Sequence, residues 1–217
     1  MSAERRARMV KEQLEARGIR DERVLQAMGK VPRERFVDEA MQARAYEDGP
    51  LPIGAGQTIS QPYMAARVLE LLALDGTETM LEVGVGSGYL LALMCELGDF
   101  AYGIERHQRL ARKAEDRLVS LGKRRFVIGA FDGTGGWPEH APYHAIAVSA
   151  GAPTVPSLLV DQLADGGRLV IPVGPQKAQR LAKVTRRGSS HDIEWSTPCI
   201  FVDLVGRYAW GGETPRA

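Results

Sequence analysis

Apolar and polar residues follow two regular patterns along the chain. Short apolar runs bounded by glycine, proline or aspartate indicate buried strands, whereas apolar residues at every third or fourth position indicate amphipathic helices. The runs predict strands at residues 79–83, 100–105, 126–129, 145–148, 167–173, 180–186 and 200–205. The helical spacing predicts helices at residues 3–17, 22–28, 33–43, 63–74, 89–97, 107–121 and 158–163.

Strands and helices alternate after residue 62, which is typical of a mostly parallel sheet with helices on both faces. We therefore expect an α/β fold of the doubly wound, Rossmann-like type. The whole chain, residues 1–217, is expected to form one domain. It would comprise a helical extension (1–45), a loop (46–62) and the core (63–210). Ligands of such folds bind beyond the carboxyl ends of the strands.

Composition narrows the class of protein without identifying it. The chain has 217 residues, of which 44% are hydrophobic and 25% charged, as in soluble globular proteins. A net charge of +1 gives no bulk electrostatic reason to expect nucleic-acid binding. The first 20 residues are charged throughout, so we expect no signal peptide, no membrane span and a cytoplasmic protein. Cys95 and Cys199 are expected to be buried free thiols, and the four histidines lack metal-ligand spacing.

Three glycines, Gly84, Gly86 and Gly88, alternate between the predicted strand 79–83 and the predicted helix 89–97. Glycine is required where a turn adopts positive φ or where the backbone must approach a ligand. A helix that begins at such a turn directs its free N–H groups at the same place. A sharp turn that binds no ligand is the alternative, although one glycine usually suffices for a turn.

The spacing of this glycine loop favours a nucleoside ligand without a pyrophosphate. The dinucleotide fingerprint is G-x-G-x-x-G, whereas here the order is G-x-G-x-G and Tyr89 stands at the position of the last glycine. Glu105 ends the next strand, 21 residues after Gly84, close to the roughly 20 expected for an acid that binds ribose. Loop and acid together indicate an adenosine-containing cofactor such as S-adenosylmethionine. Asp132 is suited to accept a hydrogen bond from adenine, or forms an ordinary Asp-Gly turn.

The segment 46–62 contains three prolines and three glycines, which exclude a regular helix. Leu51, Ile53 and Ile59 require burial, and the polar residues Gln57, Thr58, Ser60 and Gln61 are interleaved with them. We expect an ordered loop that offers hydroxyl and amide groups to a site, since long loops in compact domains are often functional. A plain connector is the alternative.

Four segments resemble the protein-L-isoaspartate O-methyltransferase family, in a match that spans about residues 9–204. They are PLPIGAGQTISQP (50–62), LEVGVGSGY (81–89), DGTGGWP (132–138) and DGGRLVIPVG (165–174). The resemblance implies the S-adenosylmethionine-dependent methyltransferase fold. It also implies methylation of the free carboxylate of L-isoaspartyl residues in damaged proteins and peptides, with S-adenosylhomocysteine as product and repair through a succinimide. The implied enzyme is a monomer without nucleic-acid or membrane partners.

The resemblance also implies roles for individual residues. Ser60 would be the catalytic serine, orienting the substrate carboxylate by a hydrogen bond; that carboxylate is already ionised at neutral pH, so no general base is required. The implied cofactor-binding residues are Thr58, Ile59, Ser60, Glu82, Gly84, Val85, Gly86, Gly88, Glu105, Asp132 and Gly133. No metal ligand is implied.

Three departures from the family pattern leave alternatives open. Phe131 replaces a glycine, residues 149–153 read SAGAP in place of Thr-Ala-Ala-x-Pro, and Asp203 replaces a common proline. Asp203 would repel an anionic substrate if it faced the site. A methyltransferase of the same fold that acts on aspartyl residues of a modified peptide, or on another carboxylate, is therefore the second hypothesis. A binding protein without enzymatic activity is the third, but it requires a damaged cofactor loop.

Overall fold

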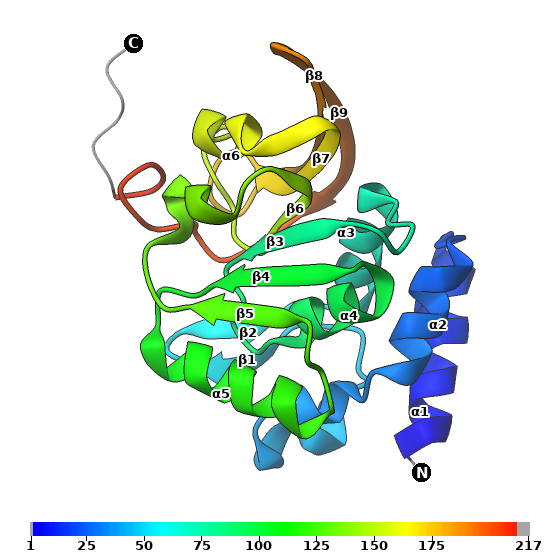
Figure 1. Cartoon of the computed structure of the whole chain (residues 1–217). Helices are drawn as coiled ribbons and strands as arrows, with labels where there is room; N and C mark the ends of the chain where they lie inside the picture. Colours follow the sequence, from blue (N-terminus) through cyan, green and yellow to red (C-terminus); the bar gives the residue numbers. More distant parts are fainter. Residues whose placement is uncertain (1, 212–217) are drawn as a thin grey trace.

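The computed structural model describes residues 2–211 and contains a seven-stranded sheet (Figure 1). The strands lie in the order β5 (Phe126–Gly129), β4 (Phe100–Ile104), β3 (Thr79–Val83), β6 (Tyr143–Val148), β7 (Leu163–Val173), β8 (Gln179–Arg187) and β9 (Ser190–Cys199). The first five strands in this order, from β5 through β4, β3 and β6 to β7, run parallel. Strands β8 and β9 follow at one side of the sheet and pair antiparallel. The predicted α/β class is confirmed. The strand order reverses between β3 and β6, which is where ligands bind in such sheets.

Both faces of the sheet are covered, but unequally. The helices are α1 (Ser2–Met9), α2 (Glu22–Lys30), α3 (Pro62–Leu72), α4 (Tyr89–Leu97), α5 (Gln108–Ser120) and α6 (Ser157–Asp161). Helices α1 to α5 share one hydrophobic core with Met80 of β3, whereas α6 shares the other core with Leu81. Adjacent residues of β3 thus point to opposite faces, as the period of a strand requires. In the described residues, no helix has the length and apolarity needed to cross a membrane.

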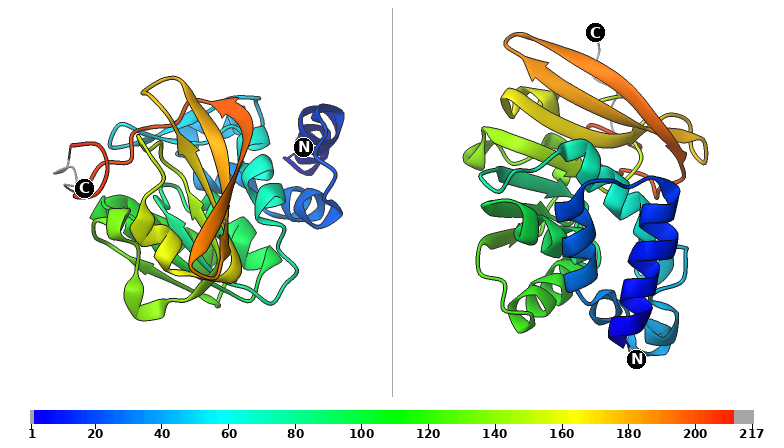
Figure 2. Two further views of the ribbon diagram at one scale, coloured as in Figure 1. Left: turned by 90° about the horizontal axis from the view of Figure 1, so that it is seen from above. Right: turned by 90° about the vertical axis from the view of Figure 1, so that its right-hand side faces the viewer.

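The N-terminal extension packs against α3 and α4 beside the sheet (Figures 1 and 2). After α1 the chain continues as a π-helix (Val10–Leu14) and a 3-10 turn (Glu15–Arg17) that ends at Gly18, with φ of 92°. The Asp21 side chain then accepts hydrogen bonds from the N–H groups of Arg23 and Val24. Gly18 and Asp21 thus separate the two predicted helices, because a short carboxylate satisfies the free donors of a helix start.

The helix predicted at residues 33–43 is wrong. Two 3-10 helices, Arg33–Phe36 and Glu39–Arg44, flank an extended residue, Val37, with φ of −120° and ψ of 161°. Phe36 and Val37 are both buried, with 0% and 3% of their surfaces exposed. Adjacent side chains of one helix point in directions about 100° apart. A break in the helix between Phe36 and Val37 therefore allows both side chains to be buried.

The segment 46–62 is ordered as expected, and it contains a hairpin that the sequence patterns did not predict. Strands β1 (Leu51–Gly54) and β2 (Gln57–Ile59) pair antiparallel through a turn at Ala55 and Gly56, both with positive φ. The apolar residues Leu51, Ile53 and Ile59 are buried against the main core. The hairpin is therefore anchored on one side and presents its polar residues on the other.

The strand predicted at residues 200–205 is also wrong. The last strand is β9, and the residues after it cross the ends of β6 and β7, where Gly151 N donates to Val202 O (2.7 Å) and Leu204 N donates to Gly151 O (2.8 Å). Consequently Cys199 is the last residue of a strand. Residues 165–167 lie within β7, at an irregularity of its pairing with β6. Cys95 and Cys199 are free and only partly buried.

Candidate active site

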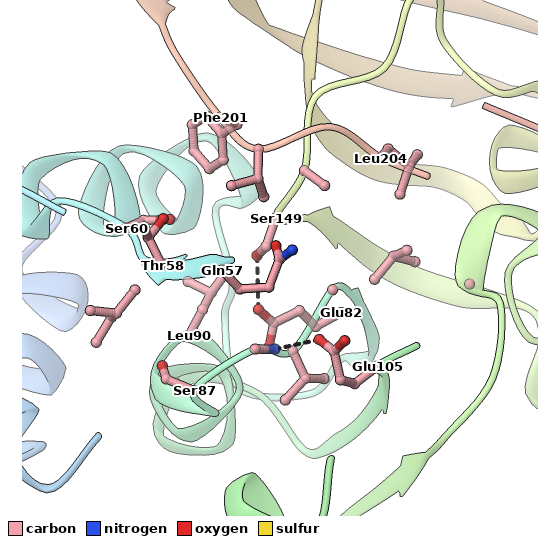
Figure 3. Close-up of a pocket in the computed structure, with 18 of the residues that line it drawn as sticks. Gln57, Thr58, Ser60, Glu82, Ser87, Leu90, Glu105, Ser149, Phe201 and Leu204 are labelled. Carbon is pink, nitrogen blue, oxygen red and sulfur yellow. Dashed lines mark hydrogen bonds between the residues drawn. The ribbon is translucent and has the colours of Figure 1, made fainter. Parts of the chain in front are cut away.

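A cavity lies beyond the carboxyl ends of β3, β4 and β6, with about 980 Å³ of empty space including its open mouth. It is lined by the β2 segment Gln57 to Ser60, the glycine loop from Gly84 to Ser87, Glu105 to His107, Gly133, Ser149 and the segment from Phe201 to Val205. Figure 3 shows Ser60 and Thr58 at the left of this cavity, and Glu82, Ser149 and Glu105 to their right. Residues predicted from four separate loops therefore meet at one place.

The glycine loop has the backbone geometry that its sequence indicates. Gly84, Gly86 and Gly88 have φ values of 88°, 52° and 88°, which favour glycine over every other residue. A Cβ on Gly86 would lie 3.2 Å from Ile53 Cδ1, so the loop also packs closely under the hairpin. Gly88 serves helix packing, since a Cβ there would lie 2.9 Å from Leu118 Cδ1 of α5. Gly88 does not line the cavity; its assigned role in cofactor binding stays a prediction.

Glu105 is buried at the end of β4, with 4% of its surface exposed. Its Oε2 accepts a hydrogen bond from Gly86 N (2.8 Å), and its Oε1 accepts one from His107 N (2.8 Å). Each carboxylate oxygen has a second lone pair. The side chain therefore ties the glycine loop to β4 and keeps the capacity to accept two hydroxyl donors from a ligand.

Glu82 brings an unpaired buried oxygen to the cavity. Its Oε1 accepts a hydrogen bond from Ser149 Oγ (2.8 Å), but its Oε2 is buried and has no partner within the described residues. Burial raises the pKa of Glu82 to about 8, and repulsion from Glu105 acts in the same direction. A buried acceptor without a partner costs about 1–3 kcal/mol, so this oxygen is suited to bind a polar or cationic group of a ligand.

Ser60 follows β2 and is half-buried at the cavity. Its Oγ makes no hydrogen bond to the described residues, and the N-cap of α3 is Gln61, which makes no capping bond either. A helix-capping role for the Ser60 hydroxyl, the plain explanation of a serine before proline, is therefore not observed. The hydroxyl group remains available to a ligand in the cavity.

Arg33 holds the backbone of Ser60 by a hydrogen bond, and the sequence patterns did not predict this contact. Its Nη2 donates to Ser60 O (2.7 Å), its Nε donates to Ala45 O (2.8 Å), and its guanidinium carbon lies 5.0 Å from the centre of the Tyr89 ring. The side chain is fully buried, and this burial lowers the pKa of Arg33. Because Arg33 lies in a segment rich in charged residues, its sequence context is typical of a solvent-exposed position. No sequence pattern therefore indicated that Arg33 is buried.

Replacing Arg33 with methionine is expected to lower the free energy of unfolding by about 2–4 kcal/mol, because the buried Ala45 carbonyl and the partly buried Ser60 carbonyl lose their donors. The change keeps a long apolar stem, which limits the cavity left behind. Urea denaturation of the variant and of Arg112→Met, an exposed arginine on α5, measures the difference. Equal stability of both variants would show that the two carbonyls do not depend on Arg33.

Asp132 lies outside the cavity lining. Its Oδ1 accepts from Thr134 N (2.9 Å) and Thr134 Oγ1 (2.8 Å), and its Oδ2 accepts from Arg207 N (2.8 Å). These bonds cap a 3-10 helix (Gly133–Gly135) and tie down the C-terminal segment. Gly133 does line the cavity. Phe131 packs edge-to-face on Trp137, at 5.0 Å between ring centres. The predicted contact of Asp132 with adenine stays a prediction.

The charges in the cavity favour a cationic ligand. Glu105 and Asp203 line it as carboxylates, against the single arginine Arg106 among the described lining residues, and Glu82 adds a third acid whose raised pKa keeps it largely protonated at neutral pH. S-adenosylmethionine carries a positive sulfonium and a positive ammonium, and opposite charges favour its binding. A glycine loop after β3, an acid at the end of β4 and this charge balance define an S-adenosylmethionine-dependent methyltransferase fold.

Comparisons with known proteins identify the family within this class. Residues 4–209 match the family model described as protein-L-isoaspartate(D-aspartate) O-methyltransferase (PCMT). The chain is 53% identical over 209 residues to protein-L-isoaspartate O-methyltransferase 2 of Geotalea uraniireducens, covering 96% of each chain. It is 54% identical to protein-L-isoaspartate O-methyltransferase of Geobacter metallireducens, covering 96% of this chain and 97% of that one. The chain therefore belongs to the protein-L-isoaspartate(D-aspartate) O-methyltransferase family.

Solved structures agree with this assignment. A protein-L-isoaspartate O-methyltransferase superposes with a TM-score of 0.84 at 26% identity, over 93% of this chain and 66% of that chain. A Plasmodium falciparum protein, described as a putative protein-L-isoaspartate O-methyltransferase in complex with S-adenosyl-L-homocysteine, superposes with a TM-score of 0.80 at 27% identity, over 92% of this chain and 98% of that one. The resemblance inferred from the sequence is confirmed.

Proposed function

We propose that the chain transfers a methyl group from S-adenosylmethionine to the free carboxylate of L-isoaspartyl residues in damaged proteins and peptides. The observation that carries this proposal is the meeting of the hairpin residues Thr58 and Ser60 with the glycine loop and Glu105 in one cavity. The products are S-adenosylhomocysteine and a methyl ester. The ester then collapses to a succinimide, which reopens in part as normal aspartate.

Four groups are placed to hold the cofactor. Glu105 keeps acceptor capacity for the ribose hydroxyls, the loop from Gly84 to Gly86 lets the backbone approach the ligand closely, and the free oxygen of Glu82 suits a cationic group. Gly133 also lines the cavity, and it packs closely on the sheet, since a Cβ there would lie 2.9 Å from Val83 Cγ1. When bound, S-adenosylmethionine supplies an electrophilic methyl group on a positive sulfur.

The residues of the chain contribute positioning rather than acid–base chemistry. Ser60 Oγ donates a hydrogen bond to the substrate carboxylate and orients it, while Arg33 holds the Ser60 backbone in place. A carboxylate is already ionised at neutral pH, so no side chain has to remove a proton. The hairpin residues Gln57 to Ile59 line the cavity, and exclusion of water by bound cofactor and peptide would expose the carboxylate oxygen to the methyl group. Such positioning contributes on the order of 7–11 kcal/mol in favourable cases.

We further propose that the chain acts as one catalytic domain, as a monomer in the cytoplasm, on proteins and peptides but not on nucleic acids. The N-terminal helices share the main core with α3 and α4, which supports one domain. Free thiols at Cys95 and Cys199 fit a reducing compartment.

A pair of peptides that differ only in the linkage of one aspartate tests the proposed function. We expect kcat/KM for the isoaspartyl peptide to exceed that for the aspartyl peptide by about 10²-fold or more, because a site built to hold one carboxylate position rejects its displacement. Release of S-adenosylhomocysteine measures both rates. Equal rates would favour a general carboxylate methyltransferase, an alternative that the names of the reported relatives do not favour. Absence of S-adenosylmethionine binding in calorimetry would instead indicate a binding protein.

A further inference from the structure

Asp203 lines the same cavity as Ser60 but has no part in the proposed transfer. Phe201 and Leu204, which flank it in the chain, border the cavity on the side opposite Glu105 (Figure 3). Asp203 therefore contributes a charged group to the cavity from a segment that the sequence patterns had assigned to a strand.

The backbone of Asp203 is held in a fixed place. The residues on either side bond to Gly151: Gly151 N donates to Val202 O (2.7 Å), and Leu204 N donates to Gly151 O (2.8 Å). Gly151 follows the end of β6, so this segment extends the sheet edge rather than forming a free loop. A carboxylate on such a rigid segment keeps its position relative to the cavity.

The charge of Asp203 is not neutralised within the described residues. Its Oδ2 accepts a hydrogen bond from the neutral side-chain amide of Gln176, and no described cation forms an ion pair with it. The amide orients the carboxylate and leaves its negative charge in place. A charge at the mouth of a cavity acts on ligands before and after they bind.

Asp203 is also separated from the groups assigned to the cofactor ribose. Glu105 ends β4, which lies on one side of β3, whereas the segment of Asp203 bridges to Gly151 after β6, on the other side of β3. The carboxylate thus acts on the part of the ligand that lies away from the ribose. That part comprises the methionine end of the cofactor and the peptide; the free oxygen of Glu82 is assigned to the cationic group of the cofactor, which leaves Asp203 to the peptide.

We propose that Asp203 sets a charge preference for the residues beside the isoaspartate: a lysine or arginine there favours methylation, and a glutamate or aspartate disfavours it. The inference rests on the proposed function. Coulomb attraction favours a flanking cation and repulsion disfavours a flanking anion at the distances of a cavity mouth, and solvent limits each effect to a modest size.

Two sets of isoaspartyl peptides test the proposal, one set varied at the residue before the isoaspartate and one at the residue after it. Each set contains a lysine, a glutamine and a glutamate peptide. For at least one position we expect kcat/KM of the lysine peptide to exceed that of the glutamate peptide about tenfold at low salt. In Asp203→Asn the ratio should fall to about twofold, and in Asp203→Glu it should persist. High salt should reduce the wild-type ratio, because ions screen exposed charges.

The control is Asp192→Asn, which removes an exposed carboxylate of β9 outside the cavity and should keep the wild-type ratio. A wild-type ratio near one at both positions, or a ratio that Asp203→Asn leaves unchanged, overturns the inference. So does a loss of S-adenosylmethionine affinity in Asp203→Asn by about tenfold or more, because one buried ion contact with the cofactor accounts for a loss of that size. If wild-type protein fails to methylate even the glutamine peptide, the proposed function fails instead.

Discussion

Alanine at position 60 is expected to lower kcat for an isoaspartyl peptide by about 10²-fold, as loss of one well-placed donor does in other enzymes. The Ser60 hydroxyl has no partner among the described residues, so its removal leaves the fold without a broken hydrogen bond. What is lost is the orientation of the substrate carboxylate. Affinity for S-adenosylmethionine should change by less than about threefold, because Glu82, the glycine loop and Glu105 remain.

Single-turnover methylation and calorimetry with S-adenosylmethionine separate these two quantities. Ser60→Thr keeps the hydroxyl group in an extended segment that tolerates a β-branched residue, and it should recover part of the rate. Ser120→Ala, which removes an exposed hydroxyl on α5, is the matched control. Full turnover by Ser60→Ala would mean that the hydroxyl has no role, and an equal loss in Ser60→Thr would point to packing.

The core around the glycine loop was predictable from the sequence because its signals are local. Strand β3 and helix α4 have the predicted bounds, 79–83 and 89–97. A buried parallel strand is a continuous apolar run, and three spaced glycines leave few conformations for the turn between strand and helix. Glu105 could be placed because the length of a strand–helix–strand unit fixes where the next strand ends.

The parts that escaped prediction depend on contacts between distant segments. Strand β9 is an exposed edge strand rich in polar residues, so it lacks the apolar run by which strands are recognised. The apolar segment after it was taken for a strand because it is a run of apolar residues, yet only Leu204 of this run is buried and Ile200 is 72% exposed. Arg33 and Asp132 are surface-like in sequence, and only tertiary structure reveals that they hold Ser60 and the C-terminal segment.

Replacing Glu82 with glutamine is expected to abolish a pH dependence of stability. Glu82 keeps its proton up to about pH 8 when folded but loses it near its ordinary pKa of about 4.3 when unfolded. The folded protein therefore binds more protons between these values, and the free energy of unfolding falls as the pH rises through this window. Relative to Glu82→Gln, the wild type should lose on the order of 3 kcal/mol between pH 5 and pH 8.

Urea denaturation at pH 5, 6, 7 and 8 measures this difference, and Glu115→Gln, an exposed acid on α5, should retain the wild-type slope. Equal slopes for wild type and Glu82→Gln would show that Glu82 is not the group that titrates.

The same carboxyl group connects stability to the cofactor. A cation placed at the unpaired Oε2 favours the ionised form of Glu82, so binding of S-adenosylhomocysteine at pH 7 should release a proton from the wild type and none from Glu82→Gln. Calorimetry in buffers of different ionisation enthalpy counts this proton. If the wild type releases none, Glu82 stays protonated in the complex and donates a hydrogen bond to the ligand instead of pairing with its charge.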